Sequence, residues 1–518
     1  MQFTQGLHRA AQQKPDEIAV YYRQRATSFR ALRDRVSRMA GAFIELGLGR
    51  GDRLAILGLN SDRYLETYLA AAWVGIVVNP INFRWSPAEI VYSIKDSESV
   101  ALMLDDQFAA QADTLGRACP TLRHRIFFGD NACPANLVDI ETMVETVTPV
   151  ADADIGGDDL FGIFYTGGTT GVPKGVMLSH LNICSSALAL LAEGCFAEGA
   201  VGLHSAPMFH LADMMTTTCL LLRGGTHVIL QAFRPDAALQ EVQARHCTDL
   251  LLVPAMIQAL VDFPAFAQYD TFSIQRILYG ASPAAESLLD RAMIALPTTE
   301  FTQVYGMTEM SAVMTALSPR YHAPENRALG KLRSGGRSTY HVQVRIVDAD
   351  DHELPRGEVG EIIVRGPNVM KGYLNKPEAT EVALRNGWMH TGDMGYMDDD
   401  GYIYIVDRLK DMIISGGENV YCAEVENAVA SHPAVAACAV FGIPHAEWGE
   451  SVHAAVVLKP ESELSQEALY EHCKQRIAGY KCPRSLQLLE ALPMSGAGKV
   501  LKTALRAPFW QKQDREVG

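Results

Sequence analysis

The stretch LFGIFYTGGTTGVPKG, residues 160–175, joins an apolar, strand-like run to a loop of glycine, threonine and one lysine. Open α/β sheets bind ligands at the carboxyl ends of their strands, where this loop lies. Successive backbone N–H groups in a glycine-rich turn attract anions, and the threonine hydroxyls add donors. The spacing does not fit a P-loop, because Pro173 precedes Lys174 and Gly175 follows it. The stretch indicates either another kind of phosphate-binding loop or an ordinary flexible surface turn.

Strand-like and helix-like runs alternate on both sides of this stretch. Before it, RLAILGLN (53–60) leads into SDRYLETYLAAAWVG (61–75) and IVVNPIN (76–82). After it, VGLHSAPMF (201–209) leads into HLADMMTTTCLLLRGG (210–225) and THVILQ (226–231). Each series predicts strand, helix, glycine and strand, the βαβ unit of parallel sheets covered by helices. We therefore predict an α/β fold with two related, doubly wound subdomains.

The pattern changes after about residue 330. Short strand-like runs such as VQVRIVD (342–348) and GEIIVRG (360–366) are separated by turns rich in glycine and aspartate. They predict a small antiparallel or β-barrel-like subdomain. A last segment of alternating strands and helices predicts a small α+β domain. We expect an N-terminal domain at residues 1–409 and a C-terminal domain at residues 410–518.

Composition narrows the class of protein. The 518 residues are 48% hydrophobic and 20% charged, with a net charge of −15, which argues against nucleic-acid binding and against a polybasic membrane anchor. The ten cysteines have no zinc-ligand spacing, and the first residues lack the apolar core of a signal peptide. The most apolar run, YLAAAWVGIVV (68–78), is too short to span a bilayer. We expect a cytoplasmic protein without integral membrane association.

Three further motifs offer charged groups at strand ends or turns. FTQVYGMTE (301–309) ends in Glu309, which could hold Mg²⁺ together with phosphate oxygens, or could simply cap a helix. WMHTGDMGYMDDDGYIYIVDR (388–408) places Asp393 in a turn, where it could accept ribose hydroxyls, and Arg408 at a strand end. LPMSGAGKVLK (492–502) places Lys499 after a glycine turn, where it could meet developing negative charge. The simple alternatives are a turn aspartate, a surface arginine and a solvated lysine.

Together, the order of these motifs resembles the adenylate-forming enzymes: acyl-CoA synthetases, non-ribosomal peptide synthetase adenylation domains and firefly-luciferase-like enzymes. The resemblance covers nearly the whole chain. Within that superfamily, LKDMIISGGENVYCAEVE (409–426), PHAEWGE (444–450) and AGYKCPRS (478–485) are similar to the CoA-ligase branch. The resemblance implies two steps, adenylation of a carboxylic acid by ATP and then thioester formation with coenzyme A. In one departure, Gly167 stands where the family usually has serine.

The resemblance also implies roles for single residues in adenylation. Thr166 and Glu309 would hold Mg²⁺, Asp393 and Arg408 would hold the ribose, and Lys499 would bridge the α-phosphate and the substrate carboxylate. We expect Lys499, Glu309 and Thr166 to be the catalytic residues. The phosphates would lie against Thr166, Gly167, Gly168, Thr169, Thr170, Gly171 and Lys174. The adenine would lie against Gly280, Ala281, Ser282, Gln303 and Tyr305, and Gly306 and Thr308 would also contact the cofactor.

Thioester formation requires the thiol to reach the carbonyl that Lys499 approaches during adenylation. The family rotates its C-terminal domain between the two steps, so the resemblance implies a mobile domain with its hinge at Lys410. Rotation would bring Gly416, Gly417 and Glu418 to the pantetheine arm of coenzyme A. Trp448 and Tyr480 would flank the adenine of coenzyme A, because aromatic faces stack on bases. The simple alternative is two ordinary core or surface aromatic residues.

The acid pocket implied by the resemblance is apolar. It would be lined by His210, Leu211, Met214, Met256, Ala281, Gly306, Met310 and Ser311. Without a lysine or arginine, it disfavours dicarboxylic acids, and it disfavours amino acids less strongly because Asp213 could face inward. A fatty acid or a hydroxycinnamate-type acid fits better.

Three alternatives stay open. The enzyme could load a carrier protein, it could oxidise its adenylate, or the chain could be a non-catalytic nucleotide-binding protein. The expected partners are a small carboxylic acid and coenzyme A, with ATP and Mg²⁺ as further ligands. A homodimer is compatible with the sequence.

Overall fold

The computed structural model describes residues 1–166, 173–282, 284–408, 411–415, 418–445, 448–494 and 500–510, with backbone only at 407, 408, 414, 418 and 419. The chain divides into two compact units. The first unit comprises Met1–Gln343 and Val364–Met389, and the second comprises Val344–Ile363 and the chain from His390 onward. The predicted fold class, a large α/β N-terminal part and a small C-terminal part, is confirmed. The predicted boundary at Lys410 falls outside the described residues and stays a prediction.

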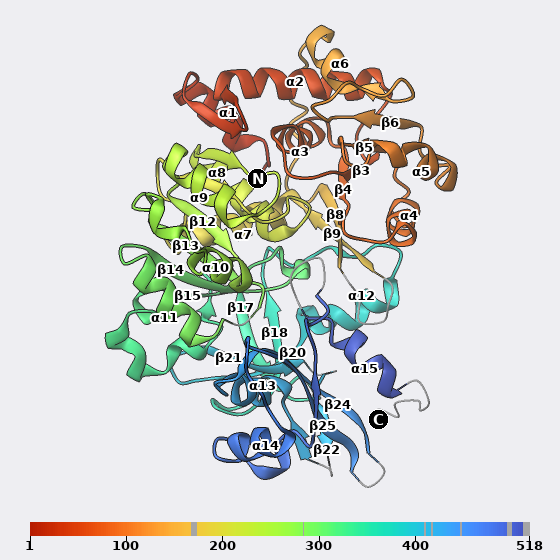
Figure 1. The fold of residues 1–518 in the computed structure, drawn as a ribbon. Coiled ribbons are helices and arrows are strands. Elements are labelled where there is room, and N and C mark those ends of the chain that lie inside the picture. Colours follow the sequence, from red (N-terminus) through yellow and green to blue (C-terminus); the bar gives the residue numbers. More distant parts are fainter. Residues whose placement is uncertain are drawn as a thin grey trace. The chain divides into compact units, whose positions relative to one another are not determined.

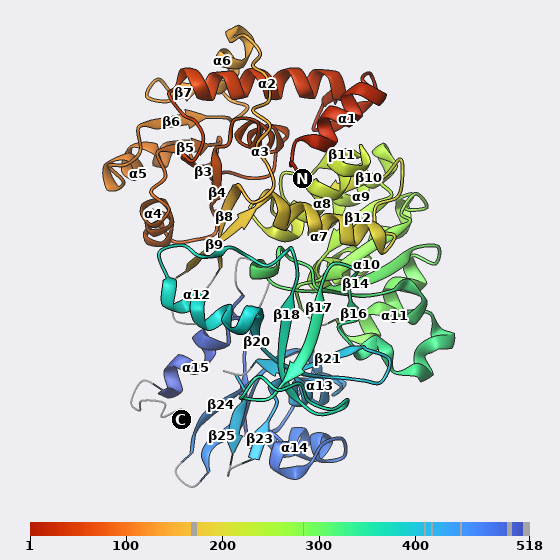
Figure 2. The ribbon, with the colours of Figure 1, turned by 180° about the vertical axis from the view of Figure 1, so that it is seen from behind.

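The first unit contains an eight-stranded sheet in the order β19-β9-β8-β4-β3-β5-β6-β7. Its central strands are parallel, and the order reverses between β3 and β5, as in doubly wound folds. In Figures 1 and 2 helices α2 and α6 lie next to each other beside this sheet. The strands are β3 Arg53–Leu57, β4 Val77–Pro80, β5 Ala101–Leu104, β6 His124–Phe127, β7 Val138–Asp139, β8 Leu160–Thr166, β9 Lys174–Ser179 and β19 Gly372–Tyr373. The helices are α2 Phe29–Glu45, α3 Asp62–Val74, α4 Pro87–Asp96, α5 Ala112–Ala118, α6 Ile140–Thr146, α7 His180–Ala192 and α12 Pro377–Ala383.

A nine-stranded sheet in the order β16-β15-β14-β13-β12-β10-β11-β1-β2 forms the second α/β half of the first unit. Its order reverses between β10 and β12, so both predicted halves are doubly wound. The strands are β1 Ile18–Tyr22, β2 Arg25–Ser28, β10 Val201–His204, β11 Thr226–Ile229, β12 Asp249–Leu252, β13 Arg276–Gly280, β14 Glu300–Tyr305, β15 Thr315–Leu317 and β16 Arg337–Ser338. The helices are α1 Gln5–Gln13, α8 Leu211–Arg223, α9 Pro235–Arg245, α10 Pro254–Val261 and α11 Glu286–Ala295.

Local signals explain the boundaries of the two helices predicted from sequence. Ser61 accepts a hydrogen bond from the backbone N–H of Tyr64 at the start of α3, and Gly75 ends that helix with a φ of 77°. His210 accepts a hydrogen bond from the N–H of Ala212 at the start of α8, and Gly224 ends it with a φ of 65°. Glycine is favoured at the C-terminal end of each helix because its backbone enters the left-handed region without strain.

The second unit contains most of a four-stranded sheet, β17 Gln343–Val347, β18 Gly360–Arg365, β20 Met389–Met397 and β21 Ile403–Arg408, in that order. It also contains a five-stranded sheet in the order β23-β22-β25-β24, with β26 beside β25. The strands of this sheet are β22 Ile413–Ser415, β23 Glu418–Val420, β24 Val435–His445, β25 Gly449–Leu458 and β26 Ser485–Leu488. The helices are α13 Cys422–Ala430, α14 Gln466–Lys474 and α15 Lys502–Trp510. No helix among the described residues is long and apolar enough to cross a bilayer.

Candidate active site

The strands before and after the glycine loop form a β-hairpin. Strands β8 and β9 pair in antiparallel register, with Thr166 opposite Lys174 at the end of the hairpin next to the loop. The chain after Pro173 continues as a strand, whereas a P-loop leads into a helix, so the structure agrees with the exclusion of that motif. The predicted phosphate-binding residues between these ends lie outside the described residues; they are Gly167, Gly168, Thr169, Thr170 and Gly171.

Glu309 and Lys174 are brought together by a tyrosine. Glu309 lies in the short helix η3 Thr308–Met310 and is only 7% exposed. The hydroxyl of Tyr373 donates a hydrogen bond of 2.8 Å to Oε1 of Glu309. The Lys174 Nζ lies 4.8 Å from the centre of the Tyr373 ring. Burial, followed by the Glu309 carboxylate, raises the pKa of Tyr373 well above its ordinary value, so the hydroxyl remains a donor.

This cluster, defined as Thr166, Lys174, Glu309 and Tyr373, contains both predicted Mg²⁺ ligands. Carboxylate and hydroxyl oxygens are hard donors of the kind that Mg²⁺ takes, and it usually keeps phosphate oxygens and water as its other ligands. The donor set therefore fits Mg²⁺ with a nucleotide phosphate. The sequence interpretation missed Tyr373. The available signal was the neighbouring Gly372, whose φ of 137° lies in a region that favours glycine.

The predicted adenine-binding residues follow two neighbouring parallel strands. Gly280 at the end of β13 lies opposite Val304 of β14, and a Cβ on Gly280 would lie 2.2 Å from the Val304 carbonyl oxygen. Ala281 follows with a φ of 66°, which is strained for a residue with a side chain. Gln303 accepts a hydrogen bond of 3.2 Å from the hydroxyl of Tyr279. Ser282 follows β13, Tyr305 ends β14, Gly306 comes directly after it, and Thr308 begins the short helix η3.

The predicted acid-binding residues come from several elements of the first unit. His210, Leu211 and Met214 belong to the start of α8, and both apolar side chains are buried. Met256 is half-buried in α10, and Met310 and Ser311 are buried after β14.

The turn that carries Met310 and Ser311 is held by Asn368. Its side-chain amide donates to the carbonyls of Met310 and Val313, both at 2.8 Å. Ser311 donates to the carbonyl of Asn368 at 3.0 Å, so its proton is already used. Asn368 was missed from the sequence because a buried asparagine carries no local pattern.

Asp393 lies within strand β20 of the second unit and not in the turn predicted from the sequence, because it pairs with β21. Two groups just before it in β20 donate to the Glu361 carboxylate: His390 Nδ1 at 2.9 Å and the N–H of Gly392 at 3.0 Å. The N–H of Asp393 donates to Oγ1 of Thr391 at 3.1 Å. Asp393 is 8% exposed and lies opposite Arg408 in the β20–β21 register.

Of the residues predicted to serve thioester formation, two are fully described. The ring of Trp448 is stacked on His445 at 4.2 Å between centroids, and the guanidinium carbon of Arg484 lies 4.3 Å from its centre. Tyr480 is 41% exposed, so its ring is accessible. Lys410, Gly416, Gly417 and Lys499 lie outside the described residues, and Glu418 is described by its backbone alone.

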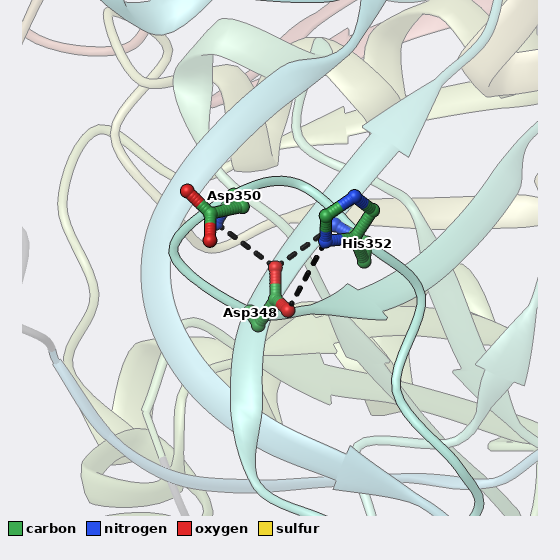
Figure 3. A group of neighbouring side chains, drawn as sticks. All are labelled: Asp348, Asp350 and His352. Carbon is green, nitrogen blue, oxygen red and sulfur yellow. Dashed lines mark hydrogen bonds and ion pairs between the residues drawn. The ribbon is translucent and has the colours of Figure 1, made fainter.

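One group of side chains in the second unit has the composition of a metal site. Asp348, Asp350 and His352 meet in an exposed turn after β17 (Figure 3). Oδ1 of Asp348 accepts from the backbone N–H groups of Asp350 and His352, both at 2.9 Å. These hydrogen bonds, chiefly that from His352, lower the pKa of Asp348. The turn explains the grouping without a metal, so no ion is assigned to it.

Comparison with known proteins gives matches along nearly the whole chain. The family model described as AMP-binding enzyme matches residues 7–374, and the model described as AMP-binding enzyme C-terminal domain matches residues 424–499. Feruloyl-CoA synthase of Amycolatopsis sp. is 38% identical over 508 residues, which cover 97% of this chain and 98% of that protein. The fatty acid–[acyl-carrier-protein] ligase ScoC of Streptomyces coeruleorubidus is 34% identical over 511 residues, 98% of this chain and 96% of that protein. The structure of O-succinylbenzoate coenzyme A synthetase (MenE) from Bacillus subtilis, in complex with ATP and magnesium ion, superposes with a TM-score of 0.83 at 30% identity. That match covers 96% of this chain and 98% of the solved one.

Proposed function

The chain belongs to the family of AMP-binding enzymes, and we propose that it joins an aromatic acid of the hydroxycinnamate type to coenzyme A. It is an AMP-forming acid–thiol ligase that uses ATP, Mg²⁺ and coenzyme A. The roles of individual residues, a homodimer and a cytoplasmic location remain predictions from the sequence. The observation that carries the proposal is the cluster of Thr166, Lys174, Glu309 and Tyr373, which fits a metal-bound nucleotide phosphate.

The reaction takes place in two steps. An oxygen of the acid carboxylate attacks the α-phosphorus of ATP, the bond to the β-phosphate oxygen breaks, and pyrophosphate leaves. The thiolate sulfur of coenzyme A then attacks the carbonyl carbon of the acyl adenylate, and AMP leaves with the electron pair of the C–O bond. Activation is needed because a free carboxylate is a poor electrophile, whereas the adenylate carries a good leaving group.

The chain's own residues would hold the phosphates during the first step. Lys174 lies at the loop end of the β8–β9 hairpin, where its charge would be attracted to the leaving pyrophosphate. Glu309 and Thr166 would hold Mg²⁺, which when bound supplies positive charge to the phosphate oxygens. The Tyr373 hydroxyl fixes the orientation of the Glu309 carboxylate through its bond of 2.8 Å.

Two observations support an aromatic or aliphatic acid that has no charged group besides its carboxylate, and disfavour an amino acid. The predicted pocket residues Leu211, Met214 and Met310 are apolar and buried. Asp213, the carboxylate that could have bound an α-ammonium group, is 1% exposed and bonded at 2.8 Å to Nδ1 of His204 in the core. Of the matches above, the feruloyl-CoA synthase is more similar than the fatty-acid ligase, 38% against 34% identical. This difference favours the aromatic class.

A screen of acids tests the proposal. Pyrophosphate release is measured over fatty, aryl and arylpropenoic acids, each with and without coenzyme A. We expect the highest kcat/KM for an arylpropenoic acid, together with an acyl-CoA product. The 34% identity to ScoC favours a second candidate, the loading of a carrier protein. Release of pyrophosphate without formation of any CoA thioester would favour that candidate, and no release with any acid would contradict both.

A further inference from the structure

Two histidines and an aspartate form a buried His–Asp network, defined as His204, Asp213 and His227. Nδ1 of His204 lies 2.8 Å from Oδ2 of Asp213, and its Nε2 lies 2.9 Å from Nδ1 of His227. The two imidazole rings are stacked at 5.1 Å with an interplanar angle of 22°. Both histidines are fully buried and Asp213 is 1% exposed. The network is therefore closed to solvent.

The sheet register places these groups beneath helix α8. His227 of β11 lies opposite Gly202 of β10, so His204, two residues further on, projects from the same face. A Cβ on Gly202 would lie 2.5 Å from a methyl carbon of Leu220, so glycine lets α8 lie close to this face. Asp213 is in the first turn of α8, so its bond to His204 joins the start of that helix to β10.

The network is expected to contribute little to the free energy of unfolding. Burial, followed by the nearby His204, holds the pKa of His227 well below its ordinary value, so this ring is neutral. Within the described part of the chain, the Nε2 of His227 has no hydrogen-bond partner. An unpartnered buried nitrogen is unfavourable, and apolar side chains often replace a buried charged group without loss of stability. The network is better explained by the position that it gives to α8.

The segment between β10 and α8 is fixed from its other side by the first α/β half. Asn60 donates to the carbonyl of Ala206 at 2.8 Å and accepts from the N–H of Met208 at 2.7 Å. Tyr68 donates to the carbonyl of Met208 at 2.7 Å. These bonds hold residues 206–208, and the bond from Asp213 to His204 holds the helical turn that follows.

We propose that His204 and Asp213 are positioning residues that set the specificity for the acid, an inference that rests on the proposed function. By joining the first turn of α8 to β10, they fix the positions of His210, Leu211 and Met214, the residues expected to contact the acid. The ATP-binding residues lie on other elements, so displacement of this turn should change recognition of the acid and leave recognition of ATP unchanged.

Replacement of Asp213 by asparagine tests the network with little change of volume. In the full-length enzyme, ATP–pyrophosphate exchange gives separate KM values for the acid and for ATP. We expect Asp213→Asn to raise the KM for the preferred acid by about tenfold or more, because small displacements of substrate-positioning groups have large effects. The KM for ATP should stay within about twofold. The KM should also depend less strongly on the length of the acid.

Two substitutions of His227 distinguish the effect of its polar group from the effect of its volume. The side-chain amide of His227→Asn can still offer a polar group to Nε2 of His204, so its KM for the acid should stay within about twofold of the wild type. His227→Leu removes that group and should raise the KM for the acid. The matched control is His180→Asn, since His180 is also a buried histidine of the first unit but accepts from the N–H of Phe3.

Hydrogen exchange of the amides of residues 211–215 is an independent readout. It should become faster in Asp213→Asn and His227→Leu and stay unchanged in His180→Asn. An unchanged KM for the acid in a folded Asp213→Asn enzyme, or an equal rise in His180→Asn, would overturn the inference. A wild type that exchanges pyrophosphate with no acid would instead contradict the proposed function. If Asp213→Asn does not fold, the comparison of His227→Asn with His227→Leu tests the inference.

Discussion

Replacing Tyr373 by phenylalanine removes one hydroxyl from the cluster around Glu309. The ring stays in place, so the contact with Lys174 at 4.8 Å is kept, while the hydrogen bond of 2.8 Å to the Glu309 carboxylate is lost. A hydrogen bond to a charged group contributes about 1.5–3 kcal/mol. If Glu309 holds the metal of Mg·ATP only in the orientation that Tyr373 gives it, kcat/KM for ATP should fall by about one to two orders of magnitude.

The assay is ATP–pyrophosphate exchange at saturating acid, with ATP and Mg²⁺ varied in turn. We expect excess Mg²⁺ to recover part of the loss, because a misoriented carboxylate weakens metal binding. Tyr165→Phe is the matched control, since it loses a tyrosine–carboxylate bond of 2.7 Å to Asp96 outside the cluster. A folded Tyr373→Phe enzyme whose kcat/KM for ATP lies within about threefold of the wild type would refute the reasoning.

Two further predictions concern buried polar groups. Burial lowers the pKa values of His180, His322 and His341 to about 4 each, whereas they titrate near about 6.5 in the unfolded chain. The folded state binds fewer protons between these values, so the stability that these groups contribute is full above about pH 6.5 and is lost as the pH falls toward about 4. Urea midpoints at about pH 7 and about pH 5 would reveal this, and equal midpoints would contradict it. Glu361→Gln cannot accept from both His390 and Gly392, so the part of β20 around Asp393 should loosen and the KM for ATP should rise about tenfold while that for the acid is kept. ATP–pyrophosphate exchange measures the KM for ATP and the KM for the acid. The control is Glu353→Gln, which changes an exposed carboxylate that pairs with Arg345.

Local sequence signals were sufficient for the elements that carry the site. Alternation of strand and helix patterns predicted β3, α3, β10 and α8, because turns and caps are encoded within a few residues. The pairing of Glu309 with Tyr373 was not predicted, because the two residues are 64 positions apart and meet only when β19 pairs with β9. The His–Asp network was missed for a similar reason. The face on which His204 and His227 meet depends on the register of β10 and β11, which no local pattern specifies.

The hairpin that carries Thr166 and Lys174 has a consequence for the release of product. A phosphate at the start of a helix is attracted by the aligned peptide dipoles of that helix, an attraction that persists after the chemistry. Here the loop connects β8 and β9, two antiparallel strands whose dipoles oppose each other and leave only a small net dipole. If pyrophosphate lies beside Lys174, as proposed, its attraction there would come from side chains such as Lys174 and from the metal, and not from a helix dipole. An enzyme that expels pyrophosphate in every cycle benefits from this weaker attraction, since its leaving group can depart once those few contacts separate.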